Sequence, residues 1–185
     1  MKMENPLEPA GRAALAASRE MLALEPEEKA QALRLMAAGV RNAAEKIIRE
    51  NVLDMEEARK SGRNSAFLDR LLLTPDRVEH MACGIEQVAA LPDPVGECIR
   101  EWTRPNGLRI RQVRVPLGVI GFIYESRGTV TCDAAALCLK SGNAVILRGG
   151  KEAFQSSMCL TRLMRAALAL SLIHISEPTR RRGIS

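Results

Sequence analysis

Apolar residues recur every three to four positions through the first half of the chain, from Pro9 to Leu91, among alanine, glutamate, lysine and arginine. This spacing places them on one face of a helix and predicts helices over residues 10–24, 26–50, 52–60, 65–72 and 75–91. Pro26 and Pro75 stand where the first turn of a helix accepts proline, and Thr74 is a candidate N-cap. Each helix is apolar on one side only, so we expect these helices to pack against a partner surface and to carry no chemistry.

The pattern changes after residues 92–94, where two β-like runs, 97–103 and 108–115, flank Arg104-Pro105-Asn106-Gly107. An Asn-Gly pair between such runs is typical of a β-hairpin. Apolar and basic residues alternate along its second arm, which gives one apolar and one basic face. This pattern fits either a nucleic-acid-binding ribbon or, as we favour, a solvated arm or an interface strand.

From residue 118 the chain predicts a β-α-β-α unit. Residues 118–124 and 144–147 are short continuous apolar runs, typical of parallel strands buried on both faces. A polar loop at 125–129 and a helix from about 130 to 141, ended by Gly142-Asn143, separate the two strands. A second loop at 148–150 leads into a helix from 151 to about 170. We therefore predict an α/β fold with segments 1–91 (helices), 92–116 (hairpin), 117–170 (β-α-β-α) and 171–185 (a separate tail).

Both loops of this unit should meet at the carboxyl edge of the sheet, because the helical crossover makes the strands parallel. Helix N-termini at Val130 and Lys151 would direct free backbone N–H groups there, and Arg127 and Arg148 would add positive charge. A phosphate-bearing ligand is one interpretation and a pair of structural turns is the other. Neither a G-x-G-x-x-G motif nor a P-loop is present, so short motifs do not decide between them.

Composition excludes several classes of function. The chain has 185 residues, of which 46% are hydrophobic, 26% charged and only 3% aromatic, so an aromatic platform for single-stranded nucleic acid is disfavoured. Arg180, Arg181 and Arg182 against Glu177 give the tail a charge of +2 out of the net +5, which leaves an ordinary +3 in residues 1–170. The N-terminus lacks the apolar core of a signal peptide, and the most apolar stretch, residues 166–175, is too short to span a membrane.

Five cysteines are scattered along the chain with neither a C-x-x-C pair nor a histidine at ligand spacing. We therefore predict free thiols, no disulfide framework and no metal site. Free thiols are typical of a reducing compartment, and we expect a cytoplasmic protein.

Four segments together resemble one known family: EWTRPNGLRI (101–110), VPLGVIG (115–121), YESR (124–127) and DAAALCLKSGNAVILRGG (133–150). They are similar to the gamma-glutamyl phosphate reductase (glutamate-5-semialdehyde dehydrogenase) family of the aldehyde dehydrogenase superfamily. The resemblance covers roughly residues 10–168. It implies a partial aldehyde-dehydrogenase-like cofactor domain with a β-hairpin oligomerisation arm, and a homo-oligomeric, cytoplasmic enzyme of proline biosynthesis.

The family reaction that this resemblance implies is the NADPH-dependent reduction of L-glutamate 5-phosphate to L-glutamate 5-semialdehyde with release of phosphate. A family cysteine thiolate attacks the acyl phosphate. The implied cofactor contacts lie on both loops: Tyr124, Glu125, Ser126, Arg127, Arg148, Gly149, Gly150 and Lys151. NAD-preferring relatives often carry glutamate at the position of Lys151, so a cation there favours NADPH.

The chain departs from the family at two places within this region. Gly128 and Thr129 replace the family's Pro-Asn, which loosens a position that proline would fix and removes an amide. No cysteine matches the family's nucleophile, so no catalytic residue is present and we expect this chain to be an inactive fragment. Cys132 lies near a helix N-terminus, but we predict that it and Cys138 are buried thiols of the core.

Residues 171–185 continue neither the helix pattern nor the family, and they resemble translated sequencing-adaptor DNA. We therefore expect neither His174 as a catalytic base nor Arg180–Arg182 as a nucleic-acid patch to have a function. Two alternatives to the enzyme stay open. One is a non-catalytic fragment that binds NADPH or a phosphorylated metabolite, and the other is a protein that binds nucleic acid through its basic tail.

Overall fold

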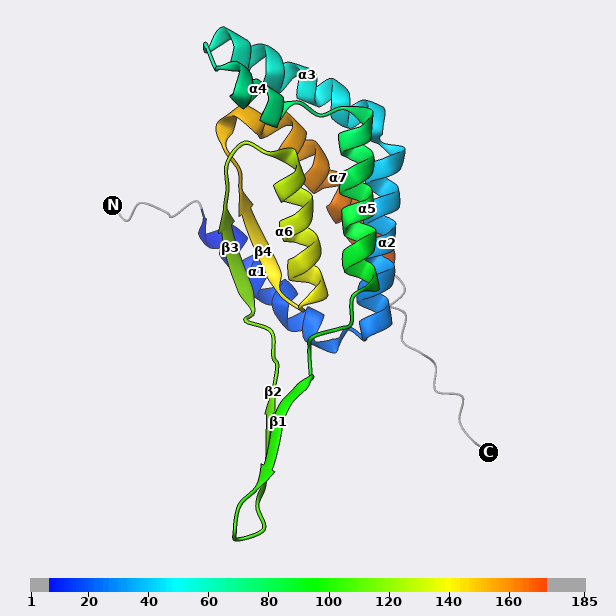
Figure 1. Cartoon of the computed structure of the whole chain (residues 1–185), viewed down its shortest axis with the longest axis vertical. Helices are drawn as coiled ribbons and strands as arrows, with labels where there is room; N and C mark the ends of the chain where they lie inside the picture. Colours follow the sequence, from blue (N-terminus) through cyan, green and yellow to red (C-terminus); the bar gives the residue numbers. More distant parts are fainter. Residues whose placement is uncertain (1–6, 173–185) are drawn as a thin grey trace, which may run out of the picture.

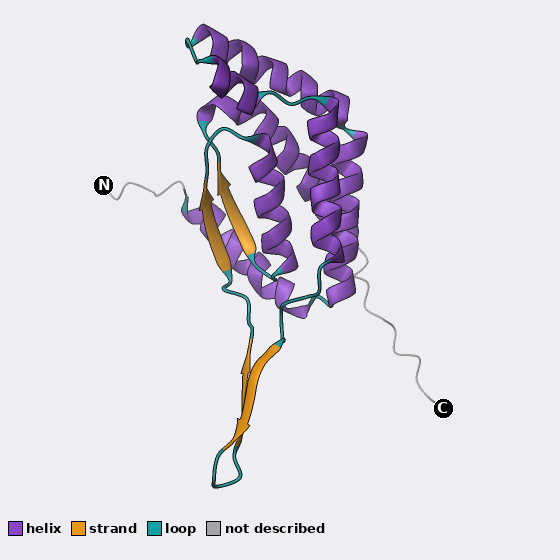
Figure 2. Cartoon of the chain, in the orientation of Figure 1, coloured by secondary structure: helices purple, strands orange, loops and turns teal. Residues whose placement is uncertain are grey.

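The computed structural model describes residues 7–172, which form a helical body, a short parallel sheet and a projecting hairpin (Figures 1 and 2). The elements in chain order are α1 (Glu8–Glu20), the 3₁₀ turn η1 (Met21–Ala23), α2 (Pro26–Asn42), α3 (Ala44–Lys60), α4 (Ser65–Leu71), α5 (Pro75–Ala90), β1 (Cys98–Thr103), β2 (Arg109–Val113), β3 (Val119–Ile123), α6 (Gly128–Lys140), β4 (Ala144–Arg148), η2 (Lys151–Ala153) and α7 (Phe154–Leu172). The predicted α/β class is confirmed. His174 and Arg180–Arg182 lie outside the described residues.

Local signals fix the starts of several helices. The Thr74 hydroxyl accepts the Arg77 N–H at 3.2 Å, so the predicted N-cap of α5 is confirmed. Pro26 opens α2, where Glu25 and Glu28 form a reciprocal capping box. Capping of this kind satisfies backbone N–H groups that have no partner within the helix.

The helix predicted over residues 26–50 is wrong in its bounds. α2 ends at Asn42, and α3 begins at Ala44 and continues to Lys60 without the predicted interruption at residue 51. Ala43, with φ −100° and ψ 15°, is the break. Alanine is a good helix former, so packing produces the break: α2 lies against α5 and α7, whereas α3 turns to cross α7 and α4.

One contiguous core joins the helices α2, α5, α6 and α7. Its fully buried side chains include Leu33, Met36, Val40, Ile85 and Leu160. The faces that the helical pattern marked as apolar in residues 10–91 therefore pack against the helices of the β-α-β-α unit. Residues before and after position 91 therefore contribute to the same core, so the predicted boundary there divides the sequence and not the core.

Strands β3 and β4 pair in parallel, with Val119 opposite Ala144 and Ile123 opposite Arg148, and α6 connects them. Helix α1 packs against both strands from behind, and α6 lies beside β4 (Figure 1). The prediction that both strands are buried on both faces is wrong for β3, because Ile123 is 82% exposed. Helices α1 and α6 both pack against β4, whereas β3 has far fewer contacts with the helices.

The predicted hairpin is confirmed and projects from the body (Figure 1). Its loop is a three-residue turn: the Gly107 N–H donates to the Arg104 carbonyl at 2.9 Å, and Arg104 N–H donates to the Leu108 carbonyl at 2.9 Å. Gly107 has φ 84°, a conformation that favours glycine, so glycine at this position sets the turn. On one face Glu101 pairs with Arg109 and Arg111, which partly neutralises the basic stripe.

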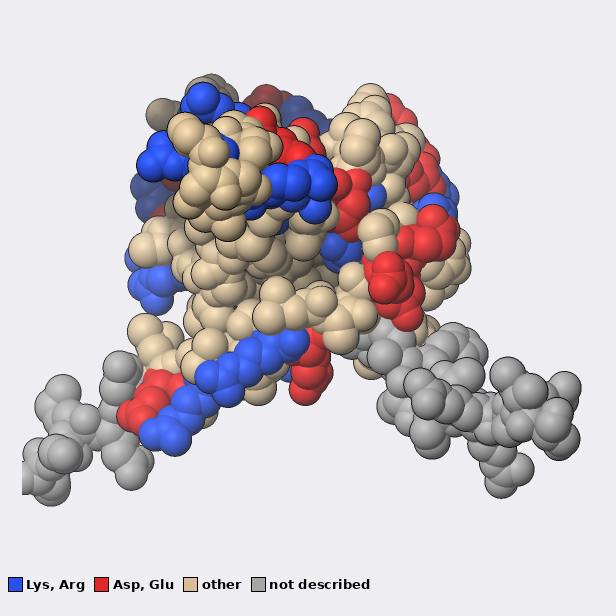
Figure 3. Space-filling model, turned by 90° about the horizontal axis from the view of Figure 1, so that it is seen from below, with Lys and Arg blue, Asp and Glu red and all other residues tan. Residues whose placement is uncertain are grey.

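Positive and negative side chains are mixed on the face from which the hairpin projects. Figure 3 views the molecule from below, and Lys and Arg are interspersed there with Asp and Glu. A nucleic-acid-binding surface usually carries a basic patch or stripe of one sign. The visible face therefore gives no support to the ribbon interpretation of the hairpin.

Candidate cofactor site at the carboxyl ends of β3 and β4

The two loops predicted to converge do meet at the ends of the parallel strands. Ile123 and Arg148 are the last paired residues, and the next N–H, that of Tyr124, donates to the Arg148 carbonyl at 3.1 Å. This bond carries the pairing one residue beyond the sheet. The loop at 124–127 therefore lies directly beside the loop at 148–151.

Tyr124 and Gly149 form the first contact between the loops. A Cβ atom at Gly149 would lie 3.1 Å from Cζ and Oη of the Tyr124 ring, so a side chain there would require the ring to move by a few tenths of an ångström. The Tyr124 hydroxyl lies 2.7 Å from Oγ1 of Thr131, a fully buried residue of α6. The ring is thus fixed at its polar end by one helix and packs against the neighbouring loop.

Ser126 and Gly150 form the second contact. A Cβ atom at Gly150 would lie 2.2 Å from Oγ of Ser126 and 3.2 Å from Oε2 of Glu152. The buried Ser126 hydroxyl donates to Oε2 of Glu152 at 2.8 Å, and Arg63 forms an ion pair with Oε1 of the same carboxylate. Ser126 therefore supports the site from inside.

The Glu152 carboxylate was not identified from the sequence. Its pKa is lowered, first by a hydrogen bond from its own backbone N–H, then by the Ser126 hydroxyl and by the charge of Arg63. It is therefore an anion at neutral pH and lies at the junction of the two loops. A glutamate after a lysine gives no sequence signal of this role.

The two helices that follow the loops begin at other residues than predicted. The first helix begins at Gly128 instead of Val130, and the second begins with the η2 turn at Lys151, so that α7 starts at Phe154. Two N–H groups in the first turn of α7, those of Gln155 and Ser156, donate to the Asp54 carboxylate at 3.0 and 2.9 Å. These N–H groups of α7 are already bonded, so they are not free for a phosphate.

Positive side chains of the loops remain available. Arg127, Arg148 and Lys151 are exposed, and none of them forms an ion pair within residues 7–172. Glu125, also exposed, is the only acidic residue within the two loops at 124–127 and 148–151. The arrangement can attract an anionic ligand through three side-chain cations at one edge of a parallel sheet.

Gly128, the departure from the family pattern, opens α6 in a closely packed position. A Cβ atom there would lie 3.2 Å from Cδ1 of Leu73 and 3.6 Å from Cδ1 of Leu160. The Asn51 side chain holds Leu73 in turn, through a hydrogen bond from the Leu73 N–H at 2.8 Å. Helix α3 therefore supports the end of the first loop indirectly, through Asn51 and Leu73. It supports the end of the second loop through Asp54, which bonds the start of α7.

The predicted burial of two thiols is confirmed. Cys132 is fully buried, and burial, with a smaller contribution from Asp133, raises the pKa of its thiol to about 12. Cys138 is also buried, and burial raises its pKa. A thiol with a raised pKa is a poor nucleophile at neutral pH, so neither cysteine has the properties of a catalytic thiolate.

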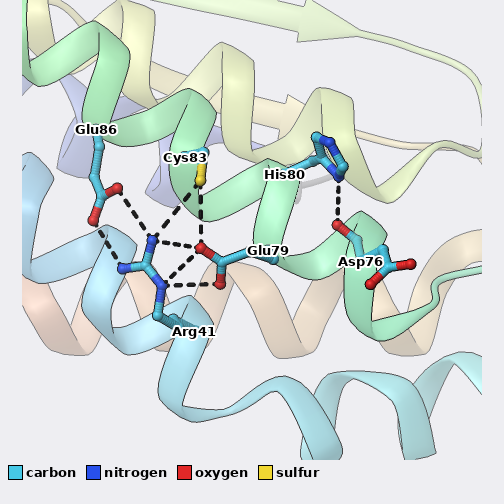
Figure 4. A network of polar contacts seen from close by, with 6 residues as sticks. All are labelled: Arg41, Asp76, Glu79, His80, Cys83 and Glu86. Atoms are coloured by element: carbon cyan, nitrogen blue, oxygen red, sulfur yellow. Dashed lines mark hydrogen bonds and ion pairs between the residues drawn. The ribbon is translucent and has the colours of Figure 1, made fainter.

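A separate polar cluster links α2 to α5 (Figure 4). Arg41 bonds both carboxylate oxygens of Glu79 and both of Glu86, at 2.8 to 3.1 Å. The Cys83 thiol donates to Glu79 at 3.3 Å. Within residues 7–172, neither this cluster nor any other group of three His, Cys, Asp or Glu side chains is arranged to hold a metal. No described helix has the length and hydropathy of a membrane-spanning segment.

Comparison with known proteins relates this architecture to one family. The model of the aldehyde dehydrogenase family matches residues 3–172. The chain is 52% identical over 181 residues to the gamma-glutamyl phosphate reductase of Rhodopseudomonas palustris (strain HaA2), covering 94% of this chain and 41% of that protein. It is 57% identical over 152 residues to that of Carboxydothermus hydrogenoformans, covering 82% and 37%.

Solved structures agree with the sequence relatives. The crystal structure of gamma-glutamyl phosphate reductase from Thermotoga maritima superposes with a TM-score of 0.86 at 38% identity, over 90% of this chain and 40% of that one. The chain thus spans about two fifths of the length of the relatives it matches.

Proposed function

Since this chain belongs to the aldehyde dehydrogenase family, we propose that it carries the cofactor-binding segment of a gamma-glutamyl phosphate reductase. The proposed reaction of the whole enzyme reduces L-glutamate 5-phosphate to L-glutamate 5-semialdehyde. The acyl carbon gains two electrons and one proton, the bond to the phosphate oxygen breaks, and phosphate leaves. The identity of 52% and 57% to two reductases supports this assignment.

The loop site fits a nicotinamide dinucleotide in its chemistry. Arg148 and Lys151 stand exposed and unpaired within the described residues, at the edge where parallel α/β sheets bind nucleotides. Gly149 and Gly150 let the second loop pack closely against Tyr124 and Ser126, because a Cβ atom at Gly150 would clash with Ser126 Oγ and one at Gly149 would lie only 3.1 Å from the Tyr124 ring. The bound cofactor would supply the hydride, and this segment would hold its phosphates and ribose.

Lys151 supports a preference for NADPH over NADH. Its exposed ammonium group follows the two glycines directly and would attract the extra 2′-phosphate of NADPH. Arg148 at the end of β4 would reinforce that attraction. The position of these two exposed cations on either side of the glycine pair is the observation on which the cofactor assignment rests.

A second function, binding of NADPH or another phosphorylated metabolite without chemistry, is favoured for this chain by the state of its thiols. Cys132 and Cys138 lie in α6, close in sequence to the loops, and both are buried with raised pKa values. We therefore expect the chain to bind the nucleotide and to show no NADPH oxidation with L-glutamate 5-phosphate. Turnover by the purified chain would contradict this expectation.

The surroundings of the proposed enzyme follow from the same assignment. All five cysteines are free, as expected in the reducing cytoplasm where we place the protein. The hairpin of β1 and β2, which extends away from the body, would serve as an oligomerisation arm between copies of the enzyme.

Titration calorimetry of the full chain with NADPH and with NADH tests the cofactor assignment. We expect NADPH to bind more tightly, and K151E to weaken NADPH binding by about tenfold or more while affecting NADH less. K46E, a charge reversal at an exposed lysine of α3, is the matched control and should leave both affinities unchanged. A flat titration with both nucleotides would refute the proposed site.

A further inference from the structure

Arg63 lies far from the two loops in sequence, but the end of α3 places it beside them. The Gly62 N–H bonds the Arg59 carbonyl at 3.0 Å and the Arg63 N–H bonds the Ala58 carbonyl at 3.1 Å, while Gly62 adopts φ 69°. This is the Schellman arrangement that ends a helix with a left-handed glycine. It fixes the backbone of Arg63 and the direction in which its side chain leaves the helix.

The side chain of Arg63 makes two contacts. Its guanidinium lies over the Phe67 ring, 5.0 Å from the centroid, and forms an ion pair with Oε1 of Glu152. An aromatic face and a carboxylate together hold the guanidinium in one place, because each restrains a different direction of movement. The Arg63 side chain is 42% exposed and that of Glu152 only 16%, so the carboxylate is the more enclosed partner.

Glu152 in turn reaches the first loop. Its other oxygen, Oε2, accepts the Ser126 hydroxyl at 2.8 Å, and both groups occupy the space where Gly150 lacks a side chain. The chain of contacts from Arg63 through Glu152 to Ser126 therefore spans α3, the second loop and the first loop. We call these three residues the loop clamp.

The loop clamp also affects the charge at the proposed nucleotide site. Glu152 follows Lys151 directly and introduces a negative charge at the junction where a nucleotide phosphate is proposed to bind. Like charges at this range repel, and the effect is strongest where water is partly excluded. Arg63 is the one cation that forms an ion pair with Glu152 in the described part of the chain.

We propose that Arg63 is a positioning and charge-compensating residue of the cofactor site, which holds Glu152 against Ser126 and neutralises it toward a phosphate-bearing nucleotide. The inference rests on the proposed function, and it assigns a role in nucleotide binding to a residue outside both loops. Arg63 does not touch the ligand in this scheme. It acts through Glu152.

Four versions of the full chain separate charge from structure: wild type, R63M, E152Q and R63M/E152Q. Methionine keeps an apolar stem against Phe67, and glutamine keeps an acceptor for Ser126. We expect R63M to weaken NADPH binding about three- to tenfold, and NADH binding less because NADH carries one phosphate group fewer. Removing the uncompensated charge in R63M/E152Q should restore most of the affinity.

The salt dependence of NADPH binding and a control variant, R34M, test whether the loss in R63M is electrostatic. The loss in R63M should shrink as the salt concentration rises, since ions screen the exposed side of the site. R34M removes an arginine that pairs with Glu27 within α2 and should bind both nucleotides as the wild type does. A double variant as weak as R63M, or an R63M affinity equal to the wild type, would overturn the proposal.

Failure of the inference and failure of the proposed function give different results. If the wild type binds neither nucleotide, the proposed function fails, and the compensating role of Arg63 fails with it. If the wild type binds NADPH but R63M does so equally well, only the inference fails. Hydrogen exchange of the ligand-free chain tests the positioning role separately. The amides of residues 126–128 and 149–152 should exchange faster in R63M than in the wild type, and in R34M they should exchange at the wild-type rate. Exchange of these amides in R63M at the wild-type rate would refute the positioning role.

Discussion

Asp54 and Ser156 form the contact that fixes the start of α7 against α3. Both the backbone N–H and the hydroxyl of Ser156 donate to Oδ2 of Asp54, and the two residues are 5% and 1% exposed. A residue on a different helix thus performs the role of an N-cap. The contact sets where α7 begins, and with it the path of the second loop.

Removal of this tertiary cap should destabilise the whole chain. We expect D54A to lower the free energy of unfolding by about 1–3 kcal/mol, because two backbone N–H groups and a buried hydroxyl lose their acceptor. D54N keeps an acceptor oxygen and should lie between D54A and the wild type. Urea unfolding followed by circular dichroism measures this.

The control for D54A is D69A, which removes a carboxylate that is 69% exposed and pairs with Arg77. A surface pair of this kind contributes little, so D69A should stay within about 1 kcal/mol of the wild type. Equal losses in D54A and D69A would contradict the assigned cap.

Introduction of the family's proline at Gly128 should stabilise the chain. Position 128 is the first residue of α6, where proline is well tolerated, and Arg127 before it has φ −130° and ψ 113°, as a residue preceding proline requires. We expect G128P to raise the free energy of unfolding by about 0.5–1 kcal/mol, because proline lowers the conformational entropy of the unfolded chain. The new Cβ atom meets the Leu73 side chain at 3.2 Å, and a small movement of that methyl group accommodates it.

Thermal denaturation of G128P beside G128A separates the ring from the Cβ atom. Both variants add the contact to Leu73, but only proline fixes the backbone. Midpoints of both variants below that of the wild type would show that the packing at Leu73 does not yield, and a lower midpoint in G128P than in G128A would show that the proline ring does not fit at this position.

Gly150 should be intolerant of even a methyl group. Its φ of −62° and ψ of 149° suit any residue, so the reason is steric: a Cβ atom would lie 2.2 Å from Oγ of Ser126. We expect G150A to cost about 1–3 kcal/mol of stability and S126A/G150A to recover part of it. G121A in β3, where nothing lies within 4 Å of an added Cβ, is the control. Equal melting of G150A and G121A would refute the close contact.

Thiol labelling should separate Cys98 from Cys132. With a pKa of about 12, Cys132 is a thiolate in only about one molecule in ten thousand at pH 8, and it is also fully buried. Cys98 is exposed on the hairpin. We expect iodoacetamide to modify Cys98 in the native chain and Cys132 only after unfolding, as mass spectrometry of peptides would show. Native labelling of both at one rate would contradict the buried assignment.

The pH dependence of Cys83 labelling should respond to Glu79. The carboxylate accepts the thiol hydrogen bond and repels the thiolate, and this raises the pKa of Cys83 (Figure 4). In E79Q the pKa should fall toward its ordinary value, so the thiolate forms at lower pH and alkylation at pH 8 becomes faster. E45Q, on α3, removes a charge that pairs with Arg49 and should leave the profile unchanged. A profile unaffected by E79Q would show that Glu79 does not control the thiol.

The sequence predicts those parts of the fold that depend on neighbouring residues. Asn106-Gly107 indicated the hairpin, and the order of apolar runs and helix indicated that the loops after Ile123 and Arg148 meet. Both inferences depend on turn chemistry and on crossover geometry, which act over short stretches of chain.

Other features could not be predicted because their causes are distant in sequence. Ala43 breaks a helix although alanine favours helix, and packing against two different helices is the reason. Asp54 and Arg63 lie among glutamates and arginines typical of a solvated helix face, and their partners are 102 and 89 positions away. The cofactor role of the loop residues is a prediction that nucleotide titration must test.

The packing of α1 against β4 has a consequence for synthesis on the ribosome. More than 120 residues separate the end of α1 from the start of β4, so at 5–20 residues per second the partner strand emerges about 6 to 25 seconds after the helix. A 13-residue helix is marginal in water without tertiary support. Helix α1 is therefore expected to become stable only after β4 has left the exit tunnel, so α1 does not fold in the order in which it is translated.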